Sequence, residues 1–321
     1  MDSLHICLFG RIRVTHTQDA AEVKMPPTAS ALLAFLLLHR ERCQPRDVLA
    51  CLRWGDQPQE QARNALNTAL WRLRRALEPD GTPRGTYLVT LPSGEISFNW
   101  QSDHWVDLVM FETAARHVRA VPVSDMTASH AAELESILPL YDGELLEGFY
   151  DDWALREREQ MRTLHLDCLA QLMDYYDGTA NTRASLAAGQ RILAIDPLRE
   201  EVHRQLMRLY LRSGQRSLAI RQYNTCSSVL QTELGLPPMD ETEALYQQIV
   251  SGASASELSA LDQTPRTRES RRDAGTSEQL TLTQAVQQLS LAMQAFESSR
   301  HHLQQAIYLV TTAIETQQNK T

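Results

Sequence analysis

The sequence of 321 residues has no apolar run of about 18 residues or more, the length that a membrane-spanning helix needs. Its first residues, MDSLHICLFGRIRV, lack the charged, apolar and small-residue regions of a signal peptide. The hydrophobic content of 43% and the charged content of 22% are typical of globular proteins. We therefore expect a cytoplasmic protein with no membrane partner.

Cysteine is scarce and scattered. The five cysteines are Cys7, Cys43, Cys51, Cys168 and Cys226. None belongs to a C-x-x-C pair, which argues against both a zinc site and a disulfide framework. We interpret all five as buried or incidental thiols.

Signs of catalysis are also missing. The sequence has no glycine-rich loop of the Walker type, which argues against an ATPase of that class. His301 and His302 are adjacent, so on a helix they point about 100° apart and do not share one metal ion. The stretch DGELLEGFYDD carries five carboxylates, which we interpret as a surface loop. The sequence predicts no enzymatic activity, no cofactor and no metal site.

Charge is unevenly distributed along the chain. Residues 1–105 contain 12 Lys and Arg against 11 Asp and Glu, whereas residues 106–250 contain 13 against 22. The acidic middle region is unsuited to a polyanion, so contact with nucleic acid must come from a local patch in the first 105 residues. The only dense patch there is ARNALNTALWRLRRALEP, with four arginines between positions 63 and 75.

This stretch separates into two faces when it is wound as a helix. Leu66, Leu70, Leu73 and Leu77 form an apolar stripe. The polar side carries Asn64, Thr68, Trp71 and Arg75, flanked by Arg63, Asn67 and Arg72. Amide, hydroxyl and guanidinium groups are the types that hydrogen-bond base edges and phosphates in a DNA major groove. The alternative is a solvated amphipathic helix whose arginines serve solubility.

The first hundred residues predict a small α+β domain. LHICLFGRIRV alternates apolar and polar residues around Gly10, and AEVKM resembles a short partner strand. Thr28 is a candidate cap for a core helix, ASALLAFLLLHRER, and Pro45 suits the first turn of a second helix, RDVLACLRW. After the arginine stretch, TYLVTL and EISFNW are joined by PSG and predict a hairpin.

The order of strands, three helices and a hairpin is that of a winged helix. RDVLACLRWGD, followed by ARNALNTALWRLRRALEP and the hairpin, resembles the OmpR-like DNA-binding domain as it occurs in the Streptomyces antibiotic regulatory protein family. In that family the helix after W-G-D is the recognition helix. The resemblance therefore implies that Asn64, Asn67, Thr68, Trp71 and Arg72 face DNA.

Two positions depart from the family pattern. Arg53 stands where relatives usually have an apolar residue before the tryptophan of the second helix. The hairpin from Tyr87 to Trp100 contains no Lys or Arg, so the usual charged minor-groove contact of the wing is missing. Arg84, just before the hairpin, is the nearest substitute.

Residues 106–250 predict helices throughout. LYDGELLEGFYDDWALREREQMR and DPLREEVHRQLMRLYLRSGQRSLAIRQYNTCSSVLQTELGLPP resemble the bacterial transcriptional activator domain, which follows the winged helix in the same family. A tetratricopeptide period of 34 residues relates Leu172 to Leu206, Tyr176 to Tyr210 and Ser185 to Ala219. Core positions of the repeat are assigned to Leu206, Tyr210, Gly214, Ala219 and Tyr223, with small residues where helices approach.

The last seventy residues divide into a linker and a coiled-coil sequence. Residues 251–279 are rich in Ser, Thr, Ala and charge, without apolar periodicity, which predicts a flexible linker. Residues 280–316 then show an unbroken 4-3 spacing, typical of a coiled-coil seam. The seam consists of Leu282, Val286, Leu289, Met293, Phe296, Arg300, Leu303, Ile307, Val310 and Ile314. We expect this segment to drive self-association; the alternative is a single helix packed on its own protein.

The predicted architecture is mainly α-helical with a small α+β N-terminal domain. It comprises a winged helix at 1–105, a tetratricopeptide-like helical repeat domain at 106–250, the linker and a C-terminal coiled-coil helix. The resemblance implies a transcription activator that binds short direct repeats in double-stranded promoter DNA. It also implies recruitment of RNA polymerase, partly through the sigma factor. The alternative is an interaction scaffold of helical repeats and coiled coil with weak or no specific DNA binding.

Overall fold

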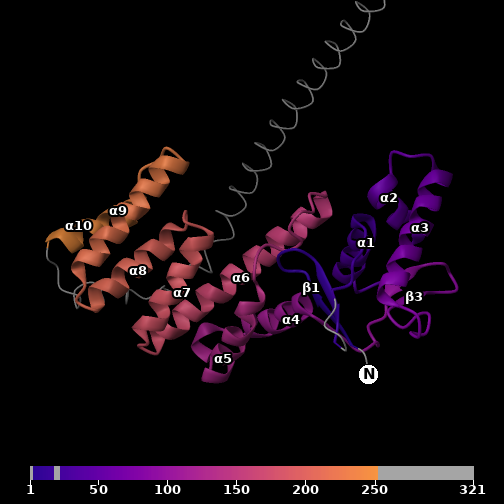
Figure 1. The fold of residues 1–321 in the computed structure, drawn as a ribbon. Helices are drawn as coiled ribbons and strands as arrows, with labels where there is room; N and C mark the ends of the chain where they lie inside the picture. Colours follow the sequence, from indigo (N-terminus) through magenta and orange to yellow (C-terminus); the bar gives the residue numbers. More distant parts are fainter. Residues whose placement is uncertain (1–2, 18–21, 252–321) are drawn as a thin grey trace, which may run out of the picture. The chain divides into compact units, whose positions relative to one another are not determined.

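The computed structural model describes residues 3–17 and 22–251, which belong to one compact unit (Figure 1). The N-terminal elements are β1 (Leu4–Cys7), β2 (Arg13–His16), α1 (Pro27–Leu38), α2 (Arg46–Trp54), α3 (Gln59–Leu77), β3 (Leu88–Thr90), β4 (Ile96–Phe98) and β5 (His104–Val106). The expected series of strands, three helices and a hairpin is therefore present.

The N-terminal sheet has the strand order β2-β1-β5. β1 pairs antiparallel with β2, with Ile6 opposite Val14, and parallel with β5, with Ile6 opposite Val106. The segment AEVKM lies beside β2: Glu22 forms an isolated antiparallel bridge to Thr15, and the Val23 N–H donates to the Val14 carbonyl at 2.8 Å, although the segment is too short to form a named strand. β5, which the sequence did not predict as a strand, pairs on the other edge of β1 although it lies about a hundred residues later in the chain.

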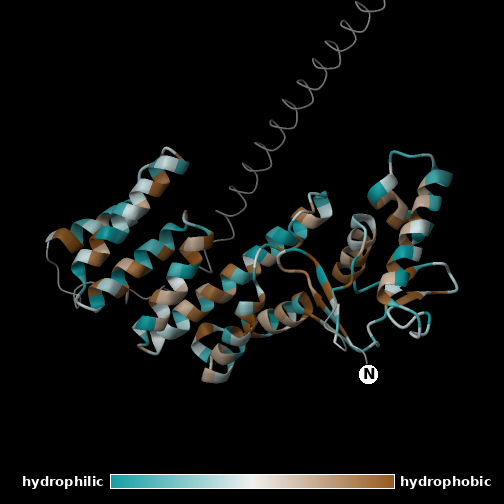
Figure 2. Cartoon of the chain, viewed as in Figure 1, coloured by the Kyte–Doolittle hydropathy of each residue, from teal (hydrophilic) through white to brown (hydrophobic). Residues whose placement is uncertain are grey.

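α1 is the core helix of this region, as predicted. Its residues from Ala29 to Leu37 are all buried, and apolar residues dominate β1 and α1 in Figure 2. Thr28 does not cap the helix, because α1 already begins at Pro27, with Pro26 at the N-cap position. Pro45 likewise lies one residue before α2 rather than in its first turn. The proline φ angle near −60° starts both helices without a side-chain cap.

The hairpin is confirmed. β3 and β4 pair antiparallel, with Leu88 opposite Phe98, and both of these side chains are buried. The PSG turn between the strands contains Gly94, whose φ of +89° is readily adopted only by glycine.

Most of the remaining described chain is helical, as predicted, but residues 141–151 are not. The helices are α4 (Asp107–Arg119), α5 (Ala128–Ile137), α6 (Asp152–Gly178), α7 (Thr182–Ile195), α8 (Glu200–Arg212), α9 (Arg216–Glu233) and α10 (Asp240–Ser251), with short 3-10 turns at Val123–Asp125 and Leu138–Leu140. α6 packs on α7, α8 packs on α9, and α7 packs on α8. This succession of helix pairs is tetratricopeptide-like.

The 34-residue period matches equivalent buried positions in successive helix pairs. Leu172 and Leu206 are buried on α6 and α8, and Ser185 and Ala219 are buried on α7 and α9. Gly214 is not a core residue as assigned: it is exposed, with a φ of +70° in the turn between α8 and α9.

The close approach of helices occurs at a different glycine. A Cβ atom on Gly189 of α7 would lie 2.8 Å from both Leu206 Cδ2 and Met173 Cε. The small residue that the repeat requires is therefore in the middle of α7, where it contacts side chains of α6 and α8.

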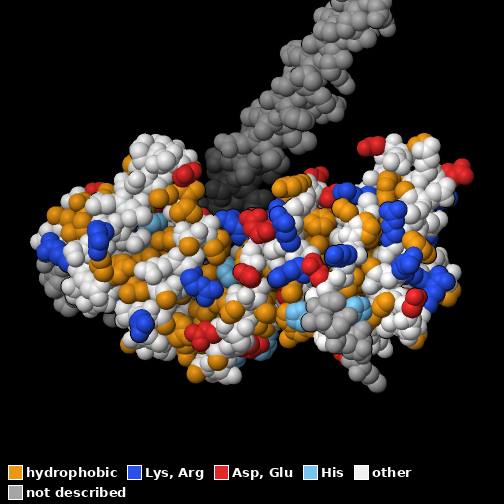
Figure 3. Space-filling model, viewed as in Figure 1, with side chains coloured by type: hydrophobic (Ala, Val, Ile, Leu, Met, Phe, Trp, Pro, Cys, Tyr) orange, Lys and Arg blue, Asp and Glu red, His pale blue; other side chains and the backbone are white. Residues whose placement is uncertain are grey.

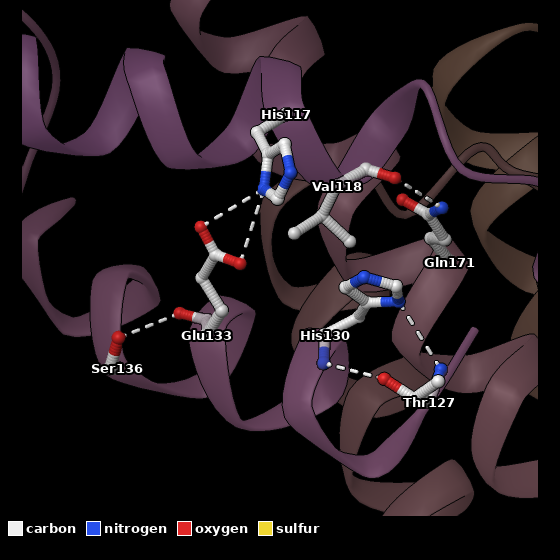
Figure 4. A network of polar contacts seen from close by, with 7 residues as sticks. All are labelled: His117, Val118, Thr127, His130, Glu133, Ser136 and Gln171. Carbon is white, nitrogen blue, oxygen red and sulfur yellow. Dashed lines mark hydrogen bonds and ion pairs between the residues drawn. The ribbon is translucent and has the colours of Figure 1, made fainter.

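Polar contacts join α4, α5 and α6 at their edges (Figure 4). His117 Nδ1 on α4 lies 3.3 Å from Glu133 Oε2 on α5, and Gln171 Nε2 on α6 donates to the Val118 carbonyl at 3.1 Å. The Thr127 side chain accepts a hydrogen bond from the His130 backbone N–H and caps α5. These contacts fix the first helices of the repeat region against one another.

We expected the acidic DGELLEGFYDD stretch to be a surface loop. Its residues 142–151 instead pack against the end of β1. Leu145 and Leu146 are fully buried, and the Leu146 N–H donates to the Leu8 carbonyl at 2.8 Å. The Gly10 N–H donates to Glu144, and the Glu147 N–H donates back to Gly10, both at 2.8 Å. The carboxylates of Asp142, Glu144 and Glu147 are exposed, while the backbone continues the pairing of β1.

Two glycines make this pairing possible. Gly10 and Gly143 both have positive φ angles, and a Cβ on Gly143 would lie 3.1 Å from Gly10 Cα. Any side chain at position 143 would therefore push residues 142–151 away from the end of β1.

Ion pairs connect α2 and the segment after α1 to the helical repeat region. Arg53 Nη1 lies 3.2 Å from Asp151 Oδ1, and Arg40 Nη2 lies 2.9 Å from Glu112 Oε2. The ring of Phe35 on α1 also contacts the ring of Trp153 on α6 edge to face, at a centroid distance of 5.4 Å. The charged residue at position 53 is thus explained by its acidic partner across this junction.

Two predicted segments lie outside the described residues. They are the linker from residue 252 and the seam predicted for self-association, which consists of Leu282 and the seam residues from Val286 to Ile314. The structure describes no helix long and apolar enough to cross a membrane. Within residues 3–17 and 22–251 there is also no cluster of His, Cys, Asp and Glu suited to a metal ion. All five cysteines are free thiols, and Cys51 is exposed.

Candidate nucleic-acid interface

α3 buries the face that its sequence predicts. Leu66, Leu70, Leu73 and Leu77 are buried, together with Ala62 and Ala69. The helix begins at Gln59, three residues before the predicted stretch, and ends at Leu77. The leucine stripe packs on α1 and α2, so the opposite side of α3 faces outward.

The predicted contact residues are all exposed: Arg63, Asn64, Asn67, Thr68, Trp71, Arg72, Arg75 and Arg84. Seven project from α3, and Arg84 projects from the segment between α3 and β3. Figure 3 shows Lys and Arg side chains gathered over this part of the surface.

A groove between α3 and the hairpin brings part of this set together. It has a volume of about 620 Å³, and its lining includes Asn67, Trp71, Arg75 and Arg84. Arg63, Asn64, Thr68 and Arg72 do not line the groove. Arg63 instead pairs with Asp47 at 3.2 Å, and the Thr68 hydroxyl donates to the Asn64 carbonyl at 3.0 Å.

Trp71 is not packed against the hairpin. Its side chain is 58% exposed, and the guanidinium carbon of Arg75 lies 5.5 Å from the ring centroid. An exposed tryptophan beside a cation is a surface able to pack on a partner.

Arg46 and Arg74, which the sequence analysis did not identify as contact residues, also line the groove. Arg74 Nη2 donates to Thr90 Oγ1 on β3 at 2.7 Å. Burial, followed by the charge of Arg84, lowers the pKa of Arg74. Arginines crowded in this way repel one another, and a bound anion relieves that repulsion.

These two residues supply the cations that the hairpin sequence lacks. Arg74 is visible in the arginine helix, but its direction toward β3 depends on the packing of α3 on the hairpin. Arg46 belongs to α2, and no periodicity in the sequence relates α2 to the groove. The positive charge beside the wing therefore comes from residues that only the tertiary structure brings together.

Glu78 fixes the segment that carries Arg84. Its carboxylate accepts hydrogen bonds from the N–H groups of Gly85 (3.1 Å), Tyr87 (2.9 Å) and Leu88 (3.0 Å). One acidic side chain at the end of α3 thereby holds residues 79–87 and the start of β3 in place.

The other side of α3 is more acidic. A second groove, of about 560 Å³, is lined by Asp47 and Glu95 as well as by Arg46, Arg63 and Asn67. Ser93 donates to Glu95 at the tip of the hairpin. The tip of the wing thus presents a carboxylate, and the cations lie at its base.

The chemistry of this surface is that of a hydrogen-bond donor array on a protruding helix. A B-DNA major groove admits an α-helix, amides and guanidiniums on such a helix are suited to base edges, and the arginines beside the hairpin are suited to phosphate oxygens.

Two family models match the chain. Residues 20–93 match "Transcriptional regulatory protein, C terminal", and residues 106–250 match "Bacterial transcriptional activator domain". The first match contains α1 to β3 with the groove, and the second contains α4 to α10.

Curated relatives are regulatory proteins of actinobacteria. The chain is 29% identical over 237 residues to the regulatory protein AfsR of Streptomyces coelicolor, covering 73% of this chain and 23% of AfsR. It is 26% identical over 229 residues to the transcriptional regulatory protein MoaR1 of Mycobacterium tuberculosis, covering 70% of this chain and 72% of MoaR1. The chain thus spans about a quarter of the length of AfsR.

A solved structure shares the fold. Mycobacterium tuberculosis EmbR, in complex with a low-affinity phosphopeptide, superimposes with a TM-score of 0.59 at 22% identity, over 82% of this chain and 72% of EmbR.

Proposed function

The chain belongs to the Streptomyces antibiotic regulatory protein family of transcriptional regulators, and we propose that it is a sequence-specific activator that reads double-stranded promoter DNA through α3. The observation that carries the proposal is the exposed polar face of α3 beside a groove lined by Arg46, Arg74 and Arg84. In this proposal α3 enters the major groove, and Arg74 and Arg84 meet phosphates of the flanking backbone.

The proposed site is a pair of short direct repeats near a promoter, as the family resemblance implies. The helical repeat region then contacts RNA polymerase, including its sigma factor. The seam at 280–316 joins copies of the chain to one another. Its small residues beside the seam, such as Ala285 and Ala292, favour an antiparallel pair or a bundle of more than two helices.

A mobility-shift titration tests DNA binding. The full-length protein is titrated against the DNA upstream of its own gene and against unrelated DNA of equal length, at two salt concentrations. We expect a specific shift whose affinity falls as salt rises. Arg84→Met should weaken binding, whereas Arg13→Met removes an exposed arginine of β2 that does not line the groove and should not.

An interaction scaffold is the second candidate function. The observation in its favour is the hairpin from Tyr87 to Trp100, which has no cation and carries Glu95 near its tip. A titration without any specific shift supports the scaffold. A specific shift, followed by stimulated transcription when RNA polymerase holoenzyme is added to the same DNA, supports the activator.

A further inference from the structure

Arg46 occupies a position that joins three elements of the winged helix. It is the first residue of α2 and lines the grooves on both sides of α3. Its Nη2 donates a hydrogen bond to Asn67 Oδ1 on α3. Its Cδ lies 3.9 Å from the place that a Cβ on Gly94 would take in the hairpin turn.

This contact determines which end of the Asn67 amide is available. An asparagine side chain has a carbonyl oxygen that accepts and an NH₂ group that donates twice. Arg46 binds the oxygen, so the amide is held with Oδ1 toward α2. The group left to meet a partner is the NH₂, which can only donate.

The restriction matters for the choice between bases. An unrestrained asparagine pairs with adenine, because its oxygen accepts from N6 while its NH₂ donates to N7. Beside Arg46, the amino group of adenine would meet an oxygen that is already engaged and a guanidinium that repels another donor. Guanine presents two acceptors, N7 and O6, and both suit the NH₂ group of Asn67.

We propose that Arg46 is a positioning residue that directs Asn67 to guanine rather than adenine. The inference rests on the proposed function, in which α3 reads the major groove. Arg46 acts here through Asn67, so its loss changes the preferred base at one position of the site and leaves the other positions as they are.

Selection of binding sites from a random pool of duplex DNA tests the inference. The full-length wild type, Asn67→Ala and Arg46→Met are each used to select sites. The position read by Asn67 is the one whose preference disappears in Asn67→Ala. We expect guanine there with the wild type, and a preference for guanine over adenine that falls at least tenfold in Arg46→Met.

Two controls separate positioning from loss of charge. Arg72→Met removes one exposed guanidinium from the flank of α3 and should keep the selected bases while lowering the salt dependence. Arg46→Lys keeps a donor and a positive charge and should keep guanine. The Arg46→Met and Asn67→Ala changes should also be non-additive, because both act on the same contact.

The result that overturns the inference is an Arg46→Met protein that selects the same base as the wild type with the same preference. Additive losses from Arg46→Met and Asn67→Ala would do the same. Failure of the proposed function looks different, because the wild type itself then selects no sequence from the pool. Circular dichroism of each variant verifies that the fold is kept.

Discussion

At the scale of single residues, the exposed face of α3 assigns different tasks to neighbouring side chains. Asn67 lies in the groove and carries an amide, which is suited to a base edge. Arg72 lies on the flank outside the groove, where phosphate is the nearer partner. Substitutions of the two residues should therefore change DNA binding in different ways.

Asn67→Ala should cost about 1–3 kcal/mol of specific binding and relax specificity at one position. Arg72→Ala should weaken binding to all sequences alike and reduce the slope of log affinity against log salt by about one. Titrations of operator and unrelated DNA at several salt concentrations measure both effects. Unchanged affinity in both variants would show that α3 is not the reader.

Trp71 provides a direct optical report of the same face. Because the ring is exposed and lies beside Arg75, we expect it to pack along the DNA backbone or sugar edge. Tryptophan fluorescence should change when operator DNA is added to the wild type and should not change in Trp71→Phe. Trp71→Ala should leave the thermal unfolding temperature almost unaltered, since the side chain contributes little to the core.

At the scale of elements, Glu78 connects α3 to the hairpin. Glu78→Ala leaves three N–H groups, those of Gly85, Tyr87 and Leu88, without their carboxylate acceptor. An unsatisfied donor costs about 1–3 kcal/mol, so urea unfolding should show a loss of about that size or more.

The same substitution should weaken DNA binding, because Arg84 loses its fixed position. Asp80→Ala makes the same change of charge at an exposed residue lining the same groove. This control should keep its stability. Equal behaviour of the two variants would mean that Glu78 acts only through its charge.

The packing of α6 on α4 has a pH dependence centred on His165. The imidazole is buried, stacked on Tyr141 at 4.2 Å, and burial lowers its pKa to about 4. The unfolded chain therefore binds a proton below about pH 6.5 that the folded chain does not bind. The stabilisation is fully present above that pH and is lost progressively as the pH falls toward 4.

Between pH 7 and pH 5 this group alone should lower the free energy of unfolding by about 2 kcal/mol. Urea titrations at the two pH values measure the change. His165→Phe should reduce the difference, with a remainder due to His203, whose pKa is also lowered by burial. A pH dependence identical in the variant would contradict the assignment to His165.

The elements also show what the sequence can and cannot predict. The leucine stripe of α3 and the hairpin followed from periodicity and turn residues, because both depend on neighbours close in the chain. β5 was missed: its three residues, HWV, have no periodicity, and only pairing with β1 makes them a strand. The pairing of residues 142–151 was missed for the same reason.

The candidate site divides in the same way. Asn67, Trp71, Arg75 and Arg84 were predicted and line the groove, since helical spacing and the position of the wing are local properties. Arg46 was not predicted, because its approach to Asn67 requires the packing of α2 on α3. Arg53 departs from the family pattern in the sequence, and only the structure shows that it forms an ion pair with Asp151.

At the scale of the whole molecule, the expected unit of binding is an assembly. A single winged helix binds a short site weakly, whereas tethered copies encounter the second repeat at a raised effective concentration. We expect the full chain to be oligomeric through residues 280–316, and deletion of these residues to lower apparent operator affinity. Arg300→Leu, which replaces the one charged seam residue, should stabilise the assembly.

Light scattering on the full chain and on residues 1–255 measures the first effect. The shorter chain retains the compact unit of residues 1–253 and should be a monomer. A full-length monomer at micromolar concentration would contradict self-association and favour a helix packed on its own protein.

The pairing of β1 also has a consequence for the order of events during synthesis. β1 is synthesised well before its partners: β5 lies about a hundred residues later, and the hydrogen bonds to Leu8 and Gly10 involve residues 144–147. Until those residues have been synthesised, Leu4, Ile6 and Phe9 lack the buried partners that they contact in the folded core. We therefore expect the winged-helix part to complete its folding only after the start of the helical repeat region has been synthesised.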